Sequence, residues 1–113
     1  MKVQYLEFVS SDVNAVCTSL ASEGIAFGEP VEALGNARVA YLPDGSMIGV
    51  REPMHVTEDP VTRAYLLVDD IEATLEQVTK EGGEVIHPAL ELPGLGSFAI
   101  YILGGIQHGL WQL

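Results

Sequence analysis

The sequence has a single cysteine, few basic residues and no long apolar run. Cys17 has no second cysteine with which to form a disulfide in the chain, which favours a reducing, cytoplasmic setting. Five basic residues stand against 16 acidic ones, giving a formal net charge of −11. Such a field repels nucleic acid and anionic membranes, so neither is expected as a partner. No apolar stretch could span a bilayer, and Met1 leads straight into a strand pattern, so no signal peptide is expected.

The residues that are present describe one folded domain. The chain has 113 residues, of which 48% are hydrophobic and 19% charged, which is enough apolar material for one core. The excess of acidic side chains would favour cationic ligands, although solubility alone also explains an acidic surface.

The first half reads as a strand, a helix and three short strands. Residues 3–9 alternate as a strand, and Ser11 or Asp12 is expected to cap the following helix. Residues on one helical face are apolar, namely Val13, Val16, Cys17, Leu20 and Ala21. Cys17 is therefore interpreted as core packing. Strand-like runs follow at 26–34 (interrupted by Pro30), 37–42 and 47–51, the last two joined by the turn pair Asp44-Gly45.

The second half repeats this order. A strand from Val61 leads to Asp69, which with Glu72 is typical of a capping box, and Ile71, Leu75 and Val78 form the buried helical stripe. Strands are then predicted at 84–90, 98–103 and 107–112. At a shift of 58, identical residues pair between the halves: Asp12, Ala15, Glu23, Gly24 and Pro30 with Asp70, Ala73, Glu81, Gly82 and Pro88.

The repeat predicts an α+β fold of two βαβββ modules. Module one is residues 1–52, a linker covers 53–60, and module two is 61–113. One module alone would leave its sheet face open to water, so two modules are expected to pair into a cleft-forming mixed β-sheet with the helices outside.

This pattern resembles the vicinal oxygen chelate superfamily, which includes glyoxalase I, bleomycin-resistance proteins and extradiol dioxygenases. The resemblance covers the whole chain. It is carried by Leu-Val-Asp-Asp-Ile-Glu-Ala-Thr-Leu at 67–75, Glu-Gly-Gly-Glu-Val at 81–85, Leu-Pro-Gly-Leu-Gly-Ser-Phe-Ala at 92–99 and Gly-Leu-Trp-Gln at 109–112. It implies the paired-module fold and, as is usual in the superfamily, a homodimer, in which modules pair within a chain or swap between chains.

The metal enzymes of the superfamily take His, Gln or Glu from the first strand of each module and Glu from the last. The resemblance puts Tyr5, Gly49, Arg63 and Gly109 at these positions. Glycine has no ligating side chain and an arginine cation repels a divalent ion. No metal, no cofactor and no metal-dependent glyoxalase or dioxygenase activity is therefore expected. The three histidines lack a readable ligand spacing, and His108 is expected to be partly buried and hydrogen-bonded, facing the helix layer.

A binding site is still expected in the cleft, and six residues are candidates for it. Strand alternation, combined with the implied arrangement, sends toward the cleft Tyr5, Glu7, Arg51, Arg63, Tyr65 and Trp111. Gly49 and Gly109 are expected to widen its floor. Arg63 would anchor an anionic or carbonyl-bearing ligand, or would simply pair with Glu7.

Two functions remain open at this point, beside a plainer option, an accessory module of a larger assembly. The first is a metal-independent protein that binds a small molecule in the cleft, like the antibiotic-resistance branch. The second is a glyoxalase-related lyase, isomerase or dioxygenase-type enzyme whose site uses Tyr5, Glu7 and Arg63 for acid, base and electrostatic roles.

Overall fold

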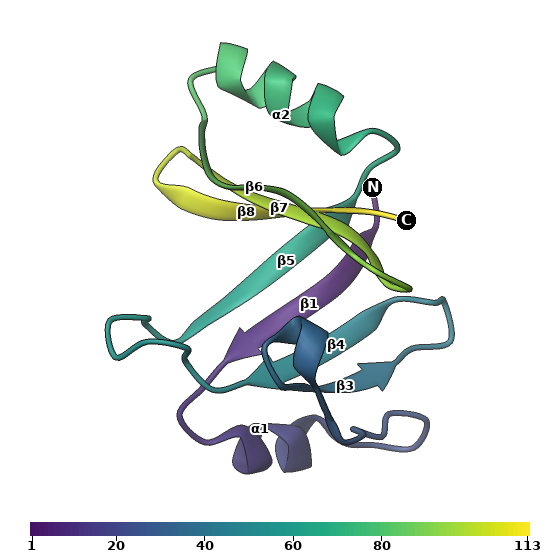
Figure 1. Cartoon of the computed structure of the whole chain (residues 1–113). Helices are drawn as coiled ribbons and strands as arrows, with labels where there is room; N and C mark the ends of the chain where they lie inside the picture. Colours follow the sequence, from purple (N-terminus) through teal and green to yellow (C-terminus); the bar gives the residue numbers. More distant parts are fainter. The chain divides into compact units, whose positions relative to one another are not determined.

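The computed structural model describes residues 1–113 and divides them into two compact units (Figure 1). The N-terminal unit is Tyr5–Thr62. The C-terminal unit is Arg63–Leu113 together with Met1–Gln4. The first residues join the C-terminal unit because the carbonyl of Lys2 accepts a 2.8 Å hydrogen bond from the backbone of Leu67. No helix has both the length and the apolar character needed to cross a bilayer.

The N-terminal unit has the predicted βαβββ order. Its elements are β1 (Val3–Val9), α1 (Val13–Leu20), β2 (Pro30–Val31), β3 (Ala37–Tyr41) and β4 (Met47–Arg51), with a 3₁₀ turn, η1 (Glu32–Leu34), after β2. The strands lie in the order β2-β3-β4-β1, and β1 runs parallel to β4 while β3 is antiparallel to both β2 and β4.

Helix α1 begins as predicted. The carboxylate of Asp12 accepts a 3.1 Å hydrogen bond from the backbone N–H of Ala15, which satisfies a donor of the first turn. Cys17 is buried in the core, as its place on the apolar face predicts, and burial raises the pKa of its thiol while nearby Arg38 lowers it. Cys17 is thus a packing residue of the core.

The strand-like run at 26–34, which Pro30 suits to an edge strand or an irregular entry, forms a strand only at Pro30–Val31, at the edge of the sheet. Only Pro30 and Val31 pair with β3, and the chain then turns through η1, which buries Leu34. Gly35 and Asn36 follow with positive φ angles of 68° and 63°, which reverse the chain into β3. The need to bury Leu34 and to turn within a few residues overrides the strand pattern here.

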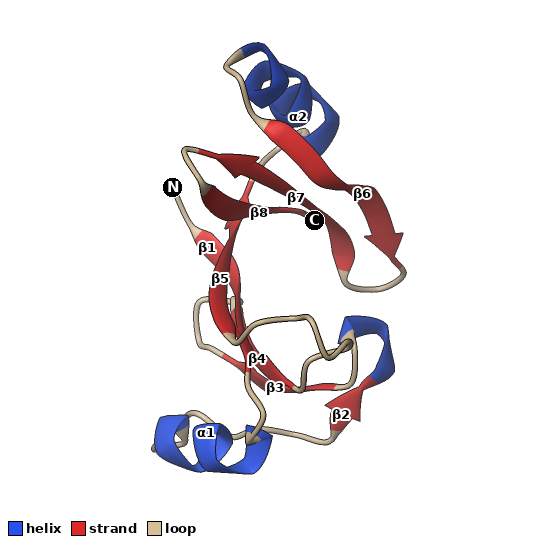
Figure 2. Cartoon of the chain, turned by 90° about the vertical axis from the view of Figure 1, so that its left-hand side faces the viewer, coloured by secondary structure: helices blue, strands red, loops and turns tan.

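The C-terminal unit repeats the same order, which confirms the α+β assignment and the two βαβββ modules. Its elements are β5 (Val61–Leu67), α2 (Ile71–Lys80), β6 (Glu84–Leu92), β7 (Gly96–Leu103) and β8 (Ile106–Gln112). The strands lie in the order β5-β8-β7-β6, with β5 parallel to β8. Helix α2 covers one face of this sheet (Figure 2). The residues buried between them are Ile71, Leu75, Val78, Ala99, Tyr101 and Leu110.

The cap of α2 is one residue later than predicted. Asp70, not Asp69, accepts the 3.0 Å hydrogen bond from the backbone of Ala73. The start is fixed from outside the helix, because the side chain of Gln112 accepts a 2.8 Å bond from the backbone of Ile71. This long-range contact sets Ile71 as the first helical residue, and it has no signature in the local sequence.

Strand β6 is longer and less regular than predicted. It continues to Leu92, and its pairing with β7 shifts register twice, between Val85 and His87 and between His87 and Leu90. Pro88 lies within the second shift, where its lack of a backbone donor is tolerated. These irregularities change the direction of the side chains on both sides of His87.

Candidate functional site

The space above Gly49 is filled by the ring of Tyr5. Strand β1 pairs with β4 so that Glu7 lies opposite Gly49, and the tyrosine two residues earlier extends over the glycine. A Cβ atom at residue 49 would overlap the phenol oxygen and the adjoining ring carbons. The expectation that Gly49 widens a cavity is therefore wrong, because the glycine makes room for a buried tyrosine.

The C-terminal unit repeats this packing with a different geometry. Tyr65 lies directly opposite Gly109 in the β5–β8 pairing, and its ring covers the glycine. A Cβ atom at residue 109 would lie 2.6 Å from Tyr65 Cγ and 2.8 Å from the carbonyl oxygen of Ala64. Gly109 therefore adds no open space either, and both expected widenings are corrected.

The four positions where the superfamily's metal ligands would stand do not fit a divalent ion. Two are glycines whose side-chain volume is taken by tyrosine rings, and a third is the cation Arg63. A phenol such as that of Tyr5 coordinates a metal ion only after it loses its proton, which ordinarily requires a pH near 10. No group of three or more His, Cys, Asp or Glu residues comes together as an alternative ligand set.

In the N-terminal unit, Arg51 is clamped between two carboxylates. Its Nε donates to Glu7 at 2.8 Å, while Nη1 and Nη2 donate to Glu58 at 2.9 and 2.8 Å. Arg51 and Glu7 are both buried, and the pKa of Arg51 is raised, first by its hydrogen bonds to Glu58 and also by Glu7, against the opposing effect of burial. Glu58 also accepts from the backbone of Met54, so the cluster fastens residues 53–60 to β4.

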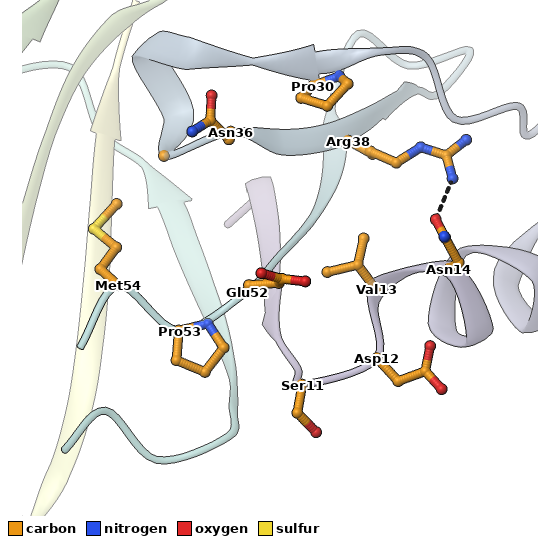
Figure 3. A pocket seen from close by; sticks show the side chains of 11 residues that line it. Ser11, Asp12, Val13, Asn14, Pro30, Asn36, Arg38, Glu52, Pro53 and Met54 are labelled. Carbon is orange, nitrogen blue, oxygen red and sulfur yellow. Dashed lines mark hydrogen bonds between the residues drawn. The ribbon is translucent and has the colours of Figure 1, made fainter. Parts of the chain in front are cut away.

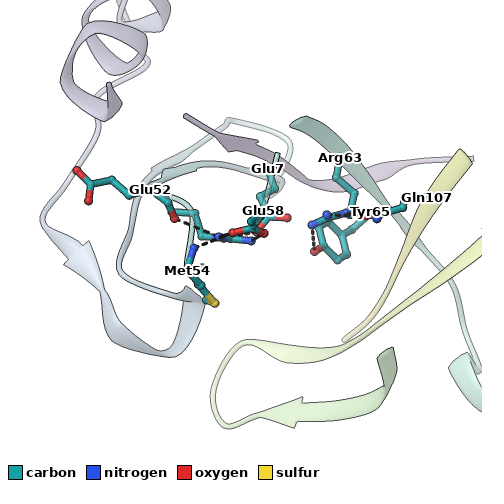
Figure 4. A network of polar contacts seen from close by, with 8 residues as sticks. Glu7, Glu52, Met54, Glu58, Arg63, Tyr65 and Gln107 are labelled. Atoms are coloured by element: carbon teal, nitrogen blue, oxygen red, sulfur yellow. Dashed lines mark hydrogen bonds and ion pairs between the residues drawn. The ribbon is translucent and has the colours of Figure 1, made fainter. Parts of the chain in front are cut away.

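In the C-terminal unit, Arg63 bonds to two neutral groups (Figure 4). Its Nε and Nη2 donate to the amide oxygen of Gln107 at 3.0 and 2.7 Å, and Nη1 donates to the hydroxyl of Tyr65 at 3.3 Å. The ring of Tyr65 makes edge-to-face contacts with Phe98 and Trp111, at centroid distances of 6.1 and 6.0 Å. This arrangement fixes the guanidinium beside aromatic side chains.

These residues belong to the sheet face that α2 does not cover. Residues paired across a sheet point to the same side. One row runs Tyr65, Gly109, Ile100 and His87 across the four strands. We use the name C-terminal sheet face for ten residues on this side: Arg63, Tyr65, His87, Leu90, Phe98, Ile100, Ile102, Gln107, Gly109 and Trp111.

The C-terminal sheet face is polar at the β5 side and apolar toward β6. Phe98, Ile100 and Ile102 are half-buried and Leu90 is 49% exposed, so this apolar wall is accessible in part. Trp111, in contrast, is 1% exposed and its indole N–H donates to the carbonyl of Leu95 at 3.3 Å. The tryptophan therefore supports the face from within and does not present a free stacking surface.

The structure gathers the six predicted site residues as two groups of three, one in each unit. Tyr5, Glu7 and Arg51 lie together in the first, and the second has Arg63, Tyr65 and Trp111. Sequence reasoning missed Glu58, which it placed in a structureless linker. It also missed Gln107, although strand alternation already put this residue on the side of Gly109 and Trp111.

His108 is half-buried and hydrogen-bonded, as expected from the sequence. Its Nε2 is 3.1 Å from the carbonyl of Leu103, and its ring stacks on Tyr101 at 4.8 Å and 5°. Because Tyr101 packs in the core beneath α2, His108 faces the helix layer as predicted.

A cavity of about 490 Å³ lies in the N-terminal unit between the start of α1, β3 and the residues after β4 (Figure 3). Two of its three charged side chains, those of Arg38 and Asp12, already have structural partners. Arg38 donates to Asn14 at 3.1 Å and to the carbonyls of Gly28 and Phe27 at 3.0 and 3.2 Å, while Asp12 caps α1. The cavity is thus a weaker candidate than the C-terminal sheet face.

Comparison with known proteins supports the fold more strongly than any activity. No family model matches the chain. Proteins described as putative glyoxylase CFP32, from Mycobacterium bovis and Mycobacterium tuberculosis, are each 31% identical over 77 residues, covering 67% of this chain. The chain spans about a quarter (26%) of the length of these curated relatives.

Among solved structures, the hypothetical protein BH1468 from Bacillus halodurans is similar over 99% of this chain and 94% of its own, with a TM-score of 0.72 and 14% identity. A fosfomycin resistance protein, FosX, from Listeria monocytogenes aligns over the whole chain with a TM-score of 0.41 and 10% identity, too low to inform the site. The chain therefore has the vicinal oxygen chelate, or glyoxalase-like, fold. Within that class it is a small two-module chain.

Proposed function

We propose that this protein binds a small molecule on the C-terminal sheet face without a metal ion. The observation that carries the proposal is the juxtaposition of Arg63, held by Gln107 and Tyr65, with the half-exposed apolar wall of Phe98 and Ile100. A mostly apolar surface with a few fixed polar groups is the usual composition of a ligand site.

Arg63 is the anchor in this proposal. A guanidinium presents paired donors that match a carboxylate or a carbonyl oxygen, and neighbouring aromatic rings lower the local polarity and strengthen such bonds. Gln107 and Tyr65 preorganise the guanidinium, so less conformational entropy is lost on binding. The expected ligand therefore has a carboxylate or carbonyl group attached to an apolar body.

Thermal shift measurements with a panel of aryl and alkyl carboxylic acids, ketones and amides test the proposal. A ligand of the native state raises the melting temperature by mass action, and Arg63→Gln should reduce that shift for the carboxylates. Lys80→Gln, which removes one positive charge from α2 in the same unit, should leave the shift unchanged. If no compound shifts the wild-type protein, or both variants behave alike, the proposal is wrong.

Metal analysis tests the second half of the proposal. Protein purified without chelator should hold no stoichiometric zinc, nickel, manganese or iron, because Tyr5, Gly49, Arg63 and Gly109 form no ligand set. A stoichiometric metal that survives dialysis would contradict it.

A second candidate function is a glyoxalase-related lyase, isomerase or dioxygenase-type enzyme. Its support is the description of the two curated relatives as putative glyoxylases. Turnover of a 2-oxoaldehyde with a thiol, measured with and without added divalent metal, would favour this candidate. Retained turnover in Arg63→Gln would separate the activity from the C-terminal sheet face.

A further inference from the structure

His87 lies on the C-terminal sheet face at an irregular point of strand β6. It pairs with Ile100, and the pairing of β6 with β7 shifts register on both sides of it. Bulges of this kind redirect a side chain and are over-represented beside functional sites. The row from His87 through Ile100 and Gly109 ends at Tyr65, which accepts the hydrogen bond from Arg63.

The carbonyl of the next residue determines which ring nitrogen of His87 carries the hydrogen. Nδ1 lies 2.7 Å from the carbonyl oxygen of Pro88. A carbonyl oxygen accepts and never donates, so Nδ1 of the neutral ring must carry the hydrogen. The other ring nitrogen, Nε2, then holds a lone pair and is an acceptor.

The orientation of the ring is also restrained. Its centroid lies 4.6 Å from that of Phe98, at an interplanar angle of 31°. Phe98 in turn contacts the ring of Tyr65, so an aromatic series connects His87 to the Arg63 end of the face. Contact with an aromatic side chain and a hydrogen bond at Nδ1 together hold Nε2 in one place.

We propose that His87 is a ligand-binding residue, which accepts a hydrogen bond through Nε2 from a hydroxyl group of the bound molecule. This rests on the proposed function of the C-terminal sheet face. The row spans three interstrand spacings, or about 14 Å between backbones. The ligand class is an elongated apolar molecule with a carboxylate or carbonyl at the Arg63 end and a hydroxyl at the His87 end, such as a hydroxyaryl carboxylic acid.

The tautomer can be tested without any ligand. At alkaline pH, where imidazoles are neutral, long-range proton–nitrogen NMR distinguishes the two ring nitrogens of each histidine. His87 should carry its hydrogen on Nδ1. His108, whose Nε2 faces the Leu103 carbonyl, should show the opposite tautomer in the same spectrum. A hydrogen on Nε2 of His87 would overturn the proposal while leaving the proposed function intact.

The binding role is tested with paired probes, hydroxyaryl carboxylic acids and the same acids lacking the hydroxyl. His87→Phe keeps an aromatic ring beside Phe98 but removes the acceptor. It should weaken binding of the hydroxylated acid roughly tenfold, the loss expected for one hydrogen bond, and leave the unhydroxylated acid unchanged. His108→Phe, a matched change on the other face of the same sheet, should alter neither affinity.

The outcomes separate the two proposals. Equal effects of His87→Phe on both acids, or none on either, overturn the role of His87 alone. If neither acid binds wild-type protein, the proposed role of His87 is wrong. The proposed function fails only if no other compound of the panel shifts the melting temperature either.

Discussion

The two units share one fold but differ in the environment of their central arginine. In the N-terminal unit, Arg51 bonds to the carboxylates of Glu7 and Glu58. In the C-terminal unit, Arg63 donates hydrogen bonds to the amide oxygen of Gln107 and the hydroxyl of Tyr65. Arg51 thereby joins residues 53–60 to strand β4. Arg63, in contrast, is held in one orientation on the C-terminal sheet face. A repeated backbone has thus been given a structural arginine in one copy and a candidate anchor in the other.

The tyrosine–glycine pairs extend this comparison. Both units pack a buried tyrosine over a glycine of the last strand, but Tyr5 reaches Gly49 with the tip of its side chain, whereas Tyr65 covers Gly109 with the base of its ring. The two last-strand positions, Gly49 and Gly109, are therefore filled by tyrosine packing in both units, with a different geometry in each.

The largest predicted effect is that of Arg51→Met. It removes one member of the buried ion pair between Glu7 and Arg51, and breaking such a pair costs about 3–5 kcal/mol of unfolding free energy. Urea denaturation should show this loss. The double variant Glu7→Gln/Arg51→Met should recover part of it, because the buried carboxylate has been replaced by a neutral amide. A near-neutral single variant would refute the structural role.

Alanine at the two glycines should have unequal effects. Gly109→Ala forces a Cβ atom against Tyr65 Cγ and the backbone oxygen of Ala64, which cannot move aside, and should cost about 1–3 kcal/mol. Gly49→Ala meets the far end of the Tyr5 side chain, which can tilt, and should cost less. Thermal or urea denaturation of both variants checks the order. Equal costs would mean that the two pairs pack alike.

Glu58→Gln should have a smaller effect than loss of Arg51. Glu58 is 23% exposed at its side chain, so its ion pair is partly screened by solvent, and a loss of about 1 kcal/mol is expected. Its removal should also increase hydrogen exchange at the backbone of Met54, which donates to Glu58. Unchanged exchange there would show that the linker is held by other contacts.

The smallest effect is expected at alkaline pH. Burial, and secondarily the charge of Glu81, raise the pKa of Tyr101 above its ordinary value of 10.0. The unfolded chain therefore loses this proton first, so stability is full below pH 10 and falls as the pH rises through the folded pKa. Tyr101→Phe should flatten the decline in melting temperature above pH 10. An identical decline in both proteins would assign it to other groups.

Local patterns were sufficient to predict much of the fold. The repeat, the apolar stripe of Ile71, Leu75 and Val78, and the glycine-rich turns all act through near neighbours in sequence, and the structure confirms them. The errors lie where distant residues decide the outcome. Gln112 fixes the start of α2, and the burial of Leu34 converts a predicted strand into a 3₁₀ turn.

The candidate site was predicted less completely for the same reason. Strand alternation predicted which side of its strand each of Tyr5, Arg63 and Tyr65 faces. It does not predict that a tyrosine fills the space above a glycine on another strand. It also cannot predict the clamp of Glu58 on Arg51, because this contact depends on the path of an irregular segment. The register shifts around His87 are equally invisible in the sequence apart from Pro88.

Chemical-shift mapping of the isotopically labelled protein with a hydroxyaryl carboxylic acid tests the central claim most directly. The account predicts that the largest perturbations fall on the C-terminal sheet face, at Arg63, Phe98, Ile100 and Gln107, and that Arg63→Gln greatly reduces them. Perturbations centred instead on α2, on the cavity beside Arg38, or on no residue at all would contradict it.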